Sequence, residues 1–186
     1  RAGKLPASAD IIQSEIVGPS LGQEAIDSGM SSFAIAFAIV LLWMIFYYGY
    51  AGAFADIALL FNLLVIFGVM TGLGAVLTLP GIAGIVLTIG MSVDANVIIY
   101  ERAKEELLAG KKIKEAVSYA FTWKGAMSSI IDANLTTALT ALILFLFGTG
   151  PIKGFATTLL IGIATSLFSA IFISRLLIEW FLNKGK

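Results

Sequence analysis

Long stretches without any charged residue alternate with short polar segments along this chain. Asp, Glu, Lys and Arg are all absent from residues 28–55, 57–93, 133–152 and 154–174. About 20 predominantly apolar residues suffice for a helix to cross a bilayer, so the second stretch has room for two crossings. The pattern therefore predicts five spanning helices, near residues 32–48, 57–79, 81–101, 126–147 and 154–181.

Two turn signals separate neighbouring helices. Pro80 and Gly81 divide the second stretch, because proline suits the first turn of a helix and leaves little room for a longer loop. Residues 148–151, Gly-Thr-Gly-Pro, join the last two helices and make them antiparallel neighbours. The predicted fold class is an all-α membrane protein, a helical bundle of five transmembrane helices.

Composition supports a membrane protein and excludes several kinds of chemistry. Hydrophobic residues make up 59% of the chain and its mean hydropathy is +0.96, whereas soluble domains are about 45–50% apolar. The sequence contains no Cys and no His, which excludes disulfides, thiol catalysis and imidazole proton relays. It also shows no nucleophile–base pair, metal-ligand set or phosphate-binding glycine loop, so we expect no enzyme, no cofactor and no nucleic-acid partner.

The basic residues indicate an orientation in the membrane. Six of the 12 Lys and Arg residues lie in one polar loop, residues 102–125. By the positive-inside rule this loop is cytoplasmic, and the C-terminal lysines fall on the same side, whereas the opposite-side turns hold only Lys153. Helical spacing from Ile113 onward predicts an amphipathic helix on the inner leaflet within this loop.

The first residues do not follow the membrane pattern. Residues 9–17 are typical of a strand, which cannot bury an apolar face alone, and a short helix is expected from Ser20. We interpret residues 1–30 as an external remnant of a periplasmic domain with a lead-in helix, and residues 31–186 as the transmembrane bundle. Because no export signal precedes this external segment, we expect the chain to be part of a longer protein.

Two carboxylates occupy costly positions. Asp94 interrupts an apolar run, and Asp132 opens the next one. A carboxylate in hydrocarbon costs roughly 2.5 kcal/mol or more, so such a group usually finds a partner or carries protons or ions. Each lies eight residues from the nearest basic residue of the loop, about 12 Å along a helix, so the two could face one another across the bundle.

We expect Asp94 to bind and release a proton, and the alternative is a carboxyl that holds two helices together without changing its charge. Asp132 lies nearer a helix start, where an acid suits the helix dipole, so its role in proton coupling is secondary. Small and polar residues accompany both carboxyls at helical spacing, which lets helices approach closely or orients a side chain. The residues assigned to this support are Gly84, Thr88, Gly90, Ser92, Asn96, Asn134, Thr136, Thr137 and Thr140.

Other polar residues near the membrane have plainer interpretations. Arg175 is expected to pair with Glu179 one turn later. Asp56 stands at the mouth of the predicted second helix and is expected to face cytoplasmic water. Asn62 is expected to hydrogen-bond a neighbouring helix.

Several motifs of the sequence resemble those of a known family. The segments are residues 79–88 (LPGIAGIVLT), 93–97 (VDANV), 132–137 (DANLTT) and 148–156 (GTGPIKGFA). They are similar to the membrane motifs of the SecD family, which together with SecF assists Sec-dependent protein export in bacteria. Residues 17–22 resemble the segment where the family's periplasmic domain returns to the membrane, so the resemblance covers nearly the whole chain.

The resemblance implies half of a pseudo-symmetric twelve-helix unit of the RND superfamily, with the first helix of the half missing. It implies SecF or a fused SecF-like half as partner, the SecYEG and SecA translocon, and an unfolded preprotein handled by the periplasmic domain. The protein would lie in the bacterial cytoplasmic membrane and use the proton gradient, with Na⁺ as a possible coupling ion, and the aspartate matching Asp94 would conduct protons. In SecF the corresponding fourth helix begins with an arginine of the proton path, and Ser129 stands there in this chain.

Two other functions remain open at this point. A small-molecule or lipid exporter of the same superfamily would carry a similar proton site. A purely scaffolding protein would need an inert Asp94.

Overall fold

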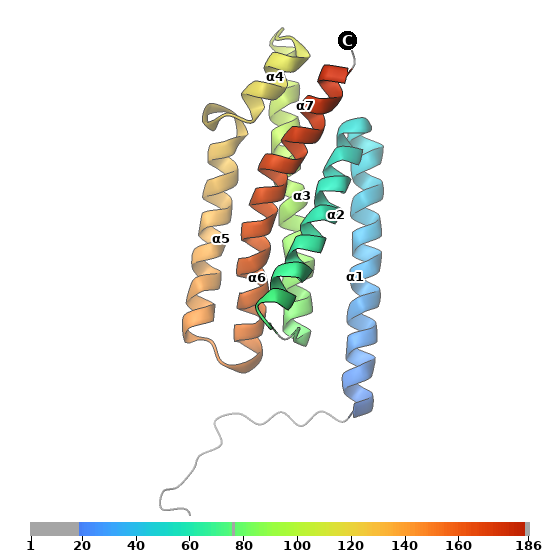
Figure 1. Ribbon diagram of the computed structural model, residues 1–186, viewed down its shortest axis with the longest axis vertical. Helices are drawn as coiled ribbons and strands as arrows, with labels where there is room; N and C mark the ends of the chain where they lie inside the picture. The colour runs from blue at the N-terminus through green and yellow to red at the C-terminus, as the bar shows by residue number, and fades with distance from the viewer. Residues whose placement is uncertain (1–18, 76, 185–186) are drawn as a thin grey trace, which may run out of the picture.

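The computed structural model describes residues 19–75 and 77–184, whose backbone forms one bundle of long helices (Figure 1). Within these residues no strand occurs, and the strand predicted for residues 9–17 lies outside them. Five helices are long and apolar enough to cross a membrane, which confirms the predicted fold class. They are Gln23–Tyr48, Tyr50–Gly72, Leu79–Leu108, Trp123–Phe147 and Gly150–Lys184.

Two of the crossings contain a short π-helical segment. In chain order the elements are α1 (Pro19–Tyr48), α2 (Tyr50–Gly72), α3 (Leu79–Leu108), α4 (Ile113–Ala120), η1 (Trp123–Met127), α5 (Ser128–Phe147), α6 (Gly150–Phe168), η2 (Ser169–Ile173) and α7 (Ser174–Lys184). The segment η1 leads into α5, and α6, η2 and α7 form the last crossing together. Figure 1 shows α1 and α5 at opposite edges of the bundle, with α4 and the ends of α3 and α7 at one end.

The helices extend beyond the predicted spans. The expected lead-in helix and first span form one continuous helix, α1, and α2 begins at Tyr50 instead of near residue 57. Helix α3 continues to Leu108 because its charged residues pair with one another along the helix. The carboxylates of Glu105 and Glu106 lie 2.7 and 2.9 Å from the Arg102 guanidinium, so charge alone does not end a helix there.

The turn between α2 and α3 differs from the predicted one. Pro80 does lie in the first turn of α3, where the Thr78 hydroxyl caps the helix by accepting the Gly81 amide at 3.1 Å. However, α2 already ends at Gly72, close to Gly74 with its φ of 63°. Glycine adopts this conformation without strain and commonly ends a helix, so α2 stops six residues before α3 begins at Leu79.

Helix α3 lies at the centre of the bundle and packs closely on α6. A Cβ atom on Gly84 would stand 2.3 Å from the Thr158 hydroxyl oxygen, and one on Gly162 would stand 2.3 Å from that of Thr88. Only glycine allows the two helices this approach. Gly90, which was expected to help in such packing, is exposed, and a Cβ there would meet nothing within 4 Å. Gly90 therefore takes no part in packing between the described helices, and its expected role in helix packing stays a prediction.

Candidate functional site

Asp94 lies at a groove between α3 and α5. The groove has a volume of about 100 Å³ and is lined by Met91, Asp94, Ala95 and Ile98 of α3 and by Ile130, Ala133, Asn134 and Thr137 of α5. At about 30 Å³ per water, it has room for roughly three molecules. The Asp94 side chain is exposed on the outer face of α3, and no Lys or Arg is among the described residues that line the groove.

Two polar side chains of α5 share the groove with Asp94. The buried Asn134 amide donates to the Ile130 carbonyl at 2.8 Å, while its Oδ1 atom has no hydrogen-bond partner within the described residues. The Thr137 hydroxyl donates to the Ala133 carbonyl of its own helix at 3.1 Å. Asn134 lines the same groove as Asp94, so a water molecule in the groove would supply the donor that this buried acceptor lacks.

Asp132 does not share this groove. Its side chain is exposed and accepts a hydrogen bond from the Ser128 hydroxyl at 3.5 Å. The possible contact between the two carboxyls across the bundle is therefore absent from the structure. The reason is the rotation of α5, because residues 130, 133, 134 and 137 face α3 and residue 132 then points away.

The threonine stripe that follows Asp132 lies on the same exposed face of α5. The Thr136 hydroxyl donates to the Asp132 carbonyl at 2.9 Å, and the Thr140 hydroxyl donates to the Thr136 carbonyl at 3.2 Å. Both hydroxyls therefore satisfy their hydrogen bonds within the helix. The face presents only the Asp132 carboxylate as an ionisable group.

The polar residues around Asp94 on its own helix belong to a different face of α3. Thr88, Ser92 and Asn96 follow one another every four residues and are buried against α2 and the last crossing. Asn62 of α2 donates to the Ser92 hydroxyl at 3.3 Å, as predicted for a bond between helices. The Ser174 hydroxyl donates to Asn96 Oδ1 at 2.6 Å. These residues join α3 to its neighbours inside the bundle, away from the groove.

Asp56 is the residue that the sequence analysis misplaced. It was expected to face water, but its side chain is buried with 7% of its surface exposed. Both of its carboxyl oxygens lack a hydrogen-bond partner in the described part of the chain. Because α2 begins at Tyr50, Asp56 lies in the second turn of the helix instead of at its mouth.

The charged groups at the α4 end of the bundle largely neutralise one another. Arg175 pairs with Glu179 at 2.7 Å, as predicted, and Lys104 pairs with Glu101 at 3.0 Å. Both of these pairs are about half exposed, so each contributes little to stability. Their position at one end of the helices agrees with a boundary between hydrocarbon and water.

The geometry defines a class of protein before any relative is considered. Five apolar helices form a bundle, a carboxyl lies in a small groove between two of them, and the described residues contain no cluster able to hold a metal ion. Such an arrangement is typical of a multi-pass membrane protein, in which an ionisable side chain within the bundle is a candidate functional site.

Comparison with known proteins gives the family. Residues 3–184 match the family described as protein export membrane protein SecD/SecF, C-terminal, and the chain belongs to this family. The chain is 50% identical to the protein translocase subunit SecD of Rhodothermus marinus over 186 residues, which are 100% of this chain and 30% of that protein. It is 52% identical to SecD of Desulfurispirillum indicum over 179 residues, which are 96% and 34% of the two chains.

A solved structure supports the same assignment. The crystal structure of SecDF from Thermus thermophilus, described as a translocon-associated membrane protein, matches with a TM-score of 0.87 and 44% identity. The match covers 91% of this chain and 23% of that one. The five-helix bundle is therefore the membrane region of this fold, and this chain spans about a third of the length of the SecD relatives.

Proposed function

We propose that this chain is the membrane part of a protein-export accessory subunit that couples the proton gradient to late steps of Sec-dependent translocation. The relatives named protein translocase subunit SecD support the role in export. The Asp94 groove supports the coupling, because it is an intramembrane carboxyl site with room for water and without a cation among its described lining residues.

In the proposed mechanism, Asp94 takes up a proton from water in the groove and releases it on the other side of the membrane. Neutralising the carboxyl lowers the cost of burying it, so protonation favours conformations in which the groove closes. The membrane potential contributes roughly 2.3 kcal/mol per charge per 100 mV, which is enough to bias such an equilibrium. Na⁺ remains the alternative coupling ion.

A second half of the proposed twelve-helix unit would cover the outer face of this bundle that carries the Asp94 groove and Asp132. The Asp94 groove and the Asp132 side chain both open on the outside of this bundle, where contact with lipid is costly for a charge. SecF or a fused SecF-like half would remove this contact. It would also supply a basic group, since the place of the SecF arginine is taken here by Ser129.

The remaining assignments follow from the proposed role. The protein would lie in the bacterial cytoplasmic membrane, with its C-terminus and residues 102–125 in the cytoplasm and residues 1–30 outside. It would act with SecYEG and SecA on an unfolded preprotein held by a periplasmic domain. The five helices would be surrounded by the lipid bilayer.

The test is export measured in vesicles that contain the full-length protein and the translocon. We expect an imposed proton gradient to accelerate preprotein release, and Asp94→Asn to abolish that acceleration, since asparagine keeps the shape of aspartate but does not titrate. The matched control is Glu179→Gln, which removes an exposed, locally paired carboxylate. Full acceleration in Asp94→Asn would contradict the proposal, and acceleration by a Na⁺ gradient alone would identify Na⁺ as the coupling ion.

A further inference from the structure

A cavity at the α4 end of the bundle has no part in the proposed mechanism. It has a volume of about 340 Å³, within the range of about 300–1,000 Å³ that is common for sites binding small molecules. Helices α1, α2, α3, α4 and α7 all contribute to its wall. Most of the wall is apolar and includes Ala51, Ala103, Leu107, Val117, Ile178 and Phe181. The interior of the cavity therefore suits an apolar group.

The cavity lies at the boundary between hydrocarbon and water. All three Trp and all five Tyr residues of the chain are found at this end of the helices, and several of them, such as Trp43 and Trp180, are exposed. Such rings are enriched where lipid headgroups meet acyl chains. The charges of α3 and of the last crossing also resume there, at Glu101 and Arg175. A lipid is therefore the apolar molecule available at this level.

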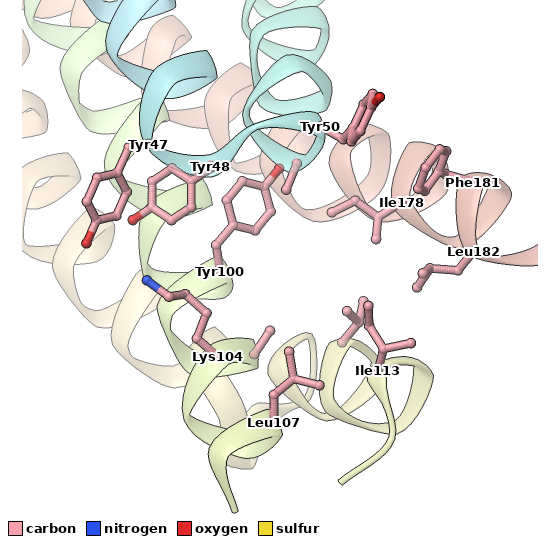
Figure 2. A pocket seen from close by; sticks show the side chains of 13 residues that line it. Tyr47, Tyr48, Tyr50, Tyr100, Lys104, Leu107, Ile113, Ile178, Phe181 and Leu182 are labelled. Atoms are coloured by element: carbon pink, nitrogen blue, oxygen red, sulfur yellow. The ribbon is translucent and has the colours of Figure 1, made fainter. Parts of the chain in front are cut away.

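The polar groups of the cavity gather on one side of it. Figure 2 shows Lys104 beside Tyr47 and Tyr48, with Ile113 on the other side. The Lys104 ammonium lies 5.0 Å from the Tyr47 ring centroid and donates one hydrogen bond, to Glu101 at 3.0 Å. An ammonium group has three donors, so two remain for an anionic oxygen at the edge of the cavity.

The surface around the cavity carries an excess of positive charge. At this end of the bundle the ion pairs between described residues use Arg102, Lys104, Lys111 and Arg175. Among the described lysines there, four take part in no such pair, namely Lys112, Lys114, Lys124 and Lys184. Lys114 lies near the cavity, since it donates to Asn183 at 2.9 Å and so joins α4 to α7. Basic residues between helices at this level attract anionic headgroups.

We propose that the cavity binds an anionic phospholipid from the leaflet at the α4 end. One acyl chain fills the apolar interior, and the phosphate accepts hydrogen bonds from the Lys104 ammonium. The unpaired lysines favour a headgroup with a net negative charge over a zwitterionic one, whose own ammonium they repel. The site is distinct from the Asp94 groove, which lies between α3 and α5, and its occupation does not depend on proton coupling.

The test is photolabelling of the full-length protein in phosphatidylcholine vesicles that contain a small fraction of a photoreactive lipid. Phosphatidylglycerol and phosphatidylcholine with the same diazirine-bearing acyl chain are compared, and mass spectrometry locates the labelled residues. We expect the phosphatidylglycerol probe to label Ile113 and Val117 about fivefold more, the effect of one basic residue on an anionic lipid. Equal labelling by the two probes, or labelling confined to exposed residues outside the cavity such as Phe46 and Leu64, would overturn the proposal.

A pair of lysine variants tests the contact with the phosphate. Lys104→Gln should reduce the labelling by phosphatidylglycerol about fivefold, to the level of the phosphatidylcholine probe. Lys124→Gln is the matched control, because Lys124 is an exposed lysine at the same end that does not line the cavity, and it should keep the preference. An unchanged preference in Lys104→Gln, or an equal loss in both variants, would show a general attraction to the surface and overturn the site.

Glu101→Gln distinguishes the charge of Lys104 from a structural role of its ion pair. This substitution removes the carboxylate that accepts from Lys104 and leaves the ammonium free for the phosphate. The preference for phosphatidylglycerol should therefore persist or increase. Its loss in Glu101→Gln as well as in Lys104→Gln would mean that the ion pair only maintains the local structure, which contradicts the contact with the phosphate.

A third pair of variants tests whether the acyl chain enters the cavity. Val117→Trp places a large ring in the cavity and should suppress labelling of Ile178 on the opposite wall, while labelling of Phe46 on the outside of α1 persists and shows that the protein is folded. Leu108→Trp is the control, since Leu108 is 90% exposed and does not line the cavity. Undiminished labelling of Ile178 in Val117→Trp would place the chain elsewhere.

Discussion

Asp94 and Asp56 are carboxyls on neighbouring helices with opposite surroundings. Asp94 is exposed at a groove that can hold water, whereas Asp56 is enclosed by apolar side chains without a hydrogen-bond partner in the described residues. The first environment allows exchange with water in this conformation. The second leaves the Asp56 carboxyl with little contact with solvent.

The position of Asp132 leads to a graded prediction. Its carboxylate is exposed and lies outside the groove that contains Asp94. Asp132→Asn should therefore reduce gradient-driven export only in part, whereas we expect Asp94→Asn to abolish the acceleration by the gradient. Rates of preprotein release from vesicles measure both effects. A larger defect in Asp132→Asn would move the site to the outer face of α5.

The sequence predicts the unusual position of Asp94 but not the burial of Asp56. The isolation of Asp94 in an apolar run identifies it as an unusual carboxyl without any coordinates. The prediction for Asp56 was wrong because this residue directly follows a charge-free stretch and was placed at a helix end. Its burial depends on which turn of α2 it occupies and on the helices that surround that turn, and neither is a property of the local sequence.

At the scale of the helices, glycine contacts set the distance between α3 and α6. Gly162→Ala would bring a Cβ atom to 2.3 Å from the Thr88 hydroxyl oxygen, and overpacking of this kind costs about 1–3 kcal/mol. We expect a lower midpoint of denaturant-induced unfolding in detergent for this variant.

Gly90→Ala is the matched control for that substitution. Gly90 belongs to the same bundle, but a Cβ there would meet nothing within 4 Å. Alanine is the better helix former by roughly 0.5–1 kcal/mol, so Gly90→Ala should leave the midpoint unchanged or raise it. Equal destabilisation by both alanines would contradict the close approach at Gly162.

The number and order of the helices could be predicted from the charge-free stretches, because hydrocarbon excludes charges over the length of a crossing. The ends of the helices could not be predicted in this way, because Arg102, Glu105 and Glu106 pair within α3 and allow the helix to continue into water. The rotation of α5 about its own axis could not be predicted from the sequence either. Polar residues occur on both faces of the helix, since Asn134 and Thr137 line the groove while Thr136 and Thr140 lie on the exposed face, so polarity alone does not identify the face that meets α3.

At the scale of the whole molecule, the exposed face of α5 is the surface that a second half would cover. The 186 residues of this chain contain no cysteine, so a single cysteine introduced here is the only thiol within them. We expect Thr140→Cys to form a crosslink to a cysteine on the facing helix of SecF or a fused SecF-like half. Electrophoresis of the full-length complex after oxidation in membranes measures the crosslink.

Leu64→Cys provides the control for this experiment. Leu64 has 73% of its surface exposed and belongs to α2, a helix that lies apart from α5 in Figure 1. It should therefore face lipid and remain uncrosslinked. Crosslinking from Leu64→Cys but not from Thr140→Cys would show that the partner covers the α2 side instead.

The central claim is that Asp94 exchanges a proton across the membrane, and proton flux tests it most directly. The full-length protein is reconstituted into vesicles containing a pH-sensitive dye, and the internal pH is followed after a proton gradient is imposed. The account predicts flux in the unmodified protein and in Glu179→Gln, and no flux above that of empty vesicles in Asp94→Asn. Undiminished flux through Asp94→Asn would contradict it.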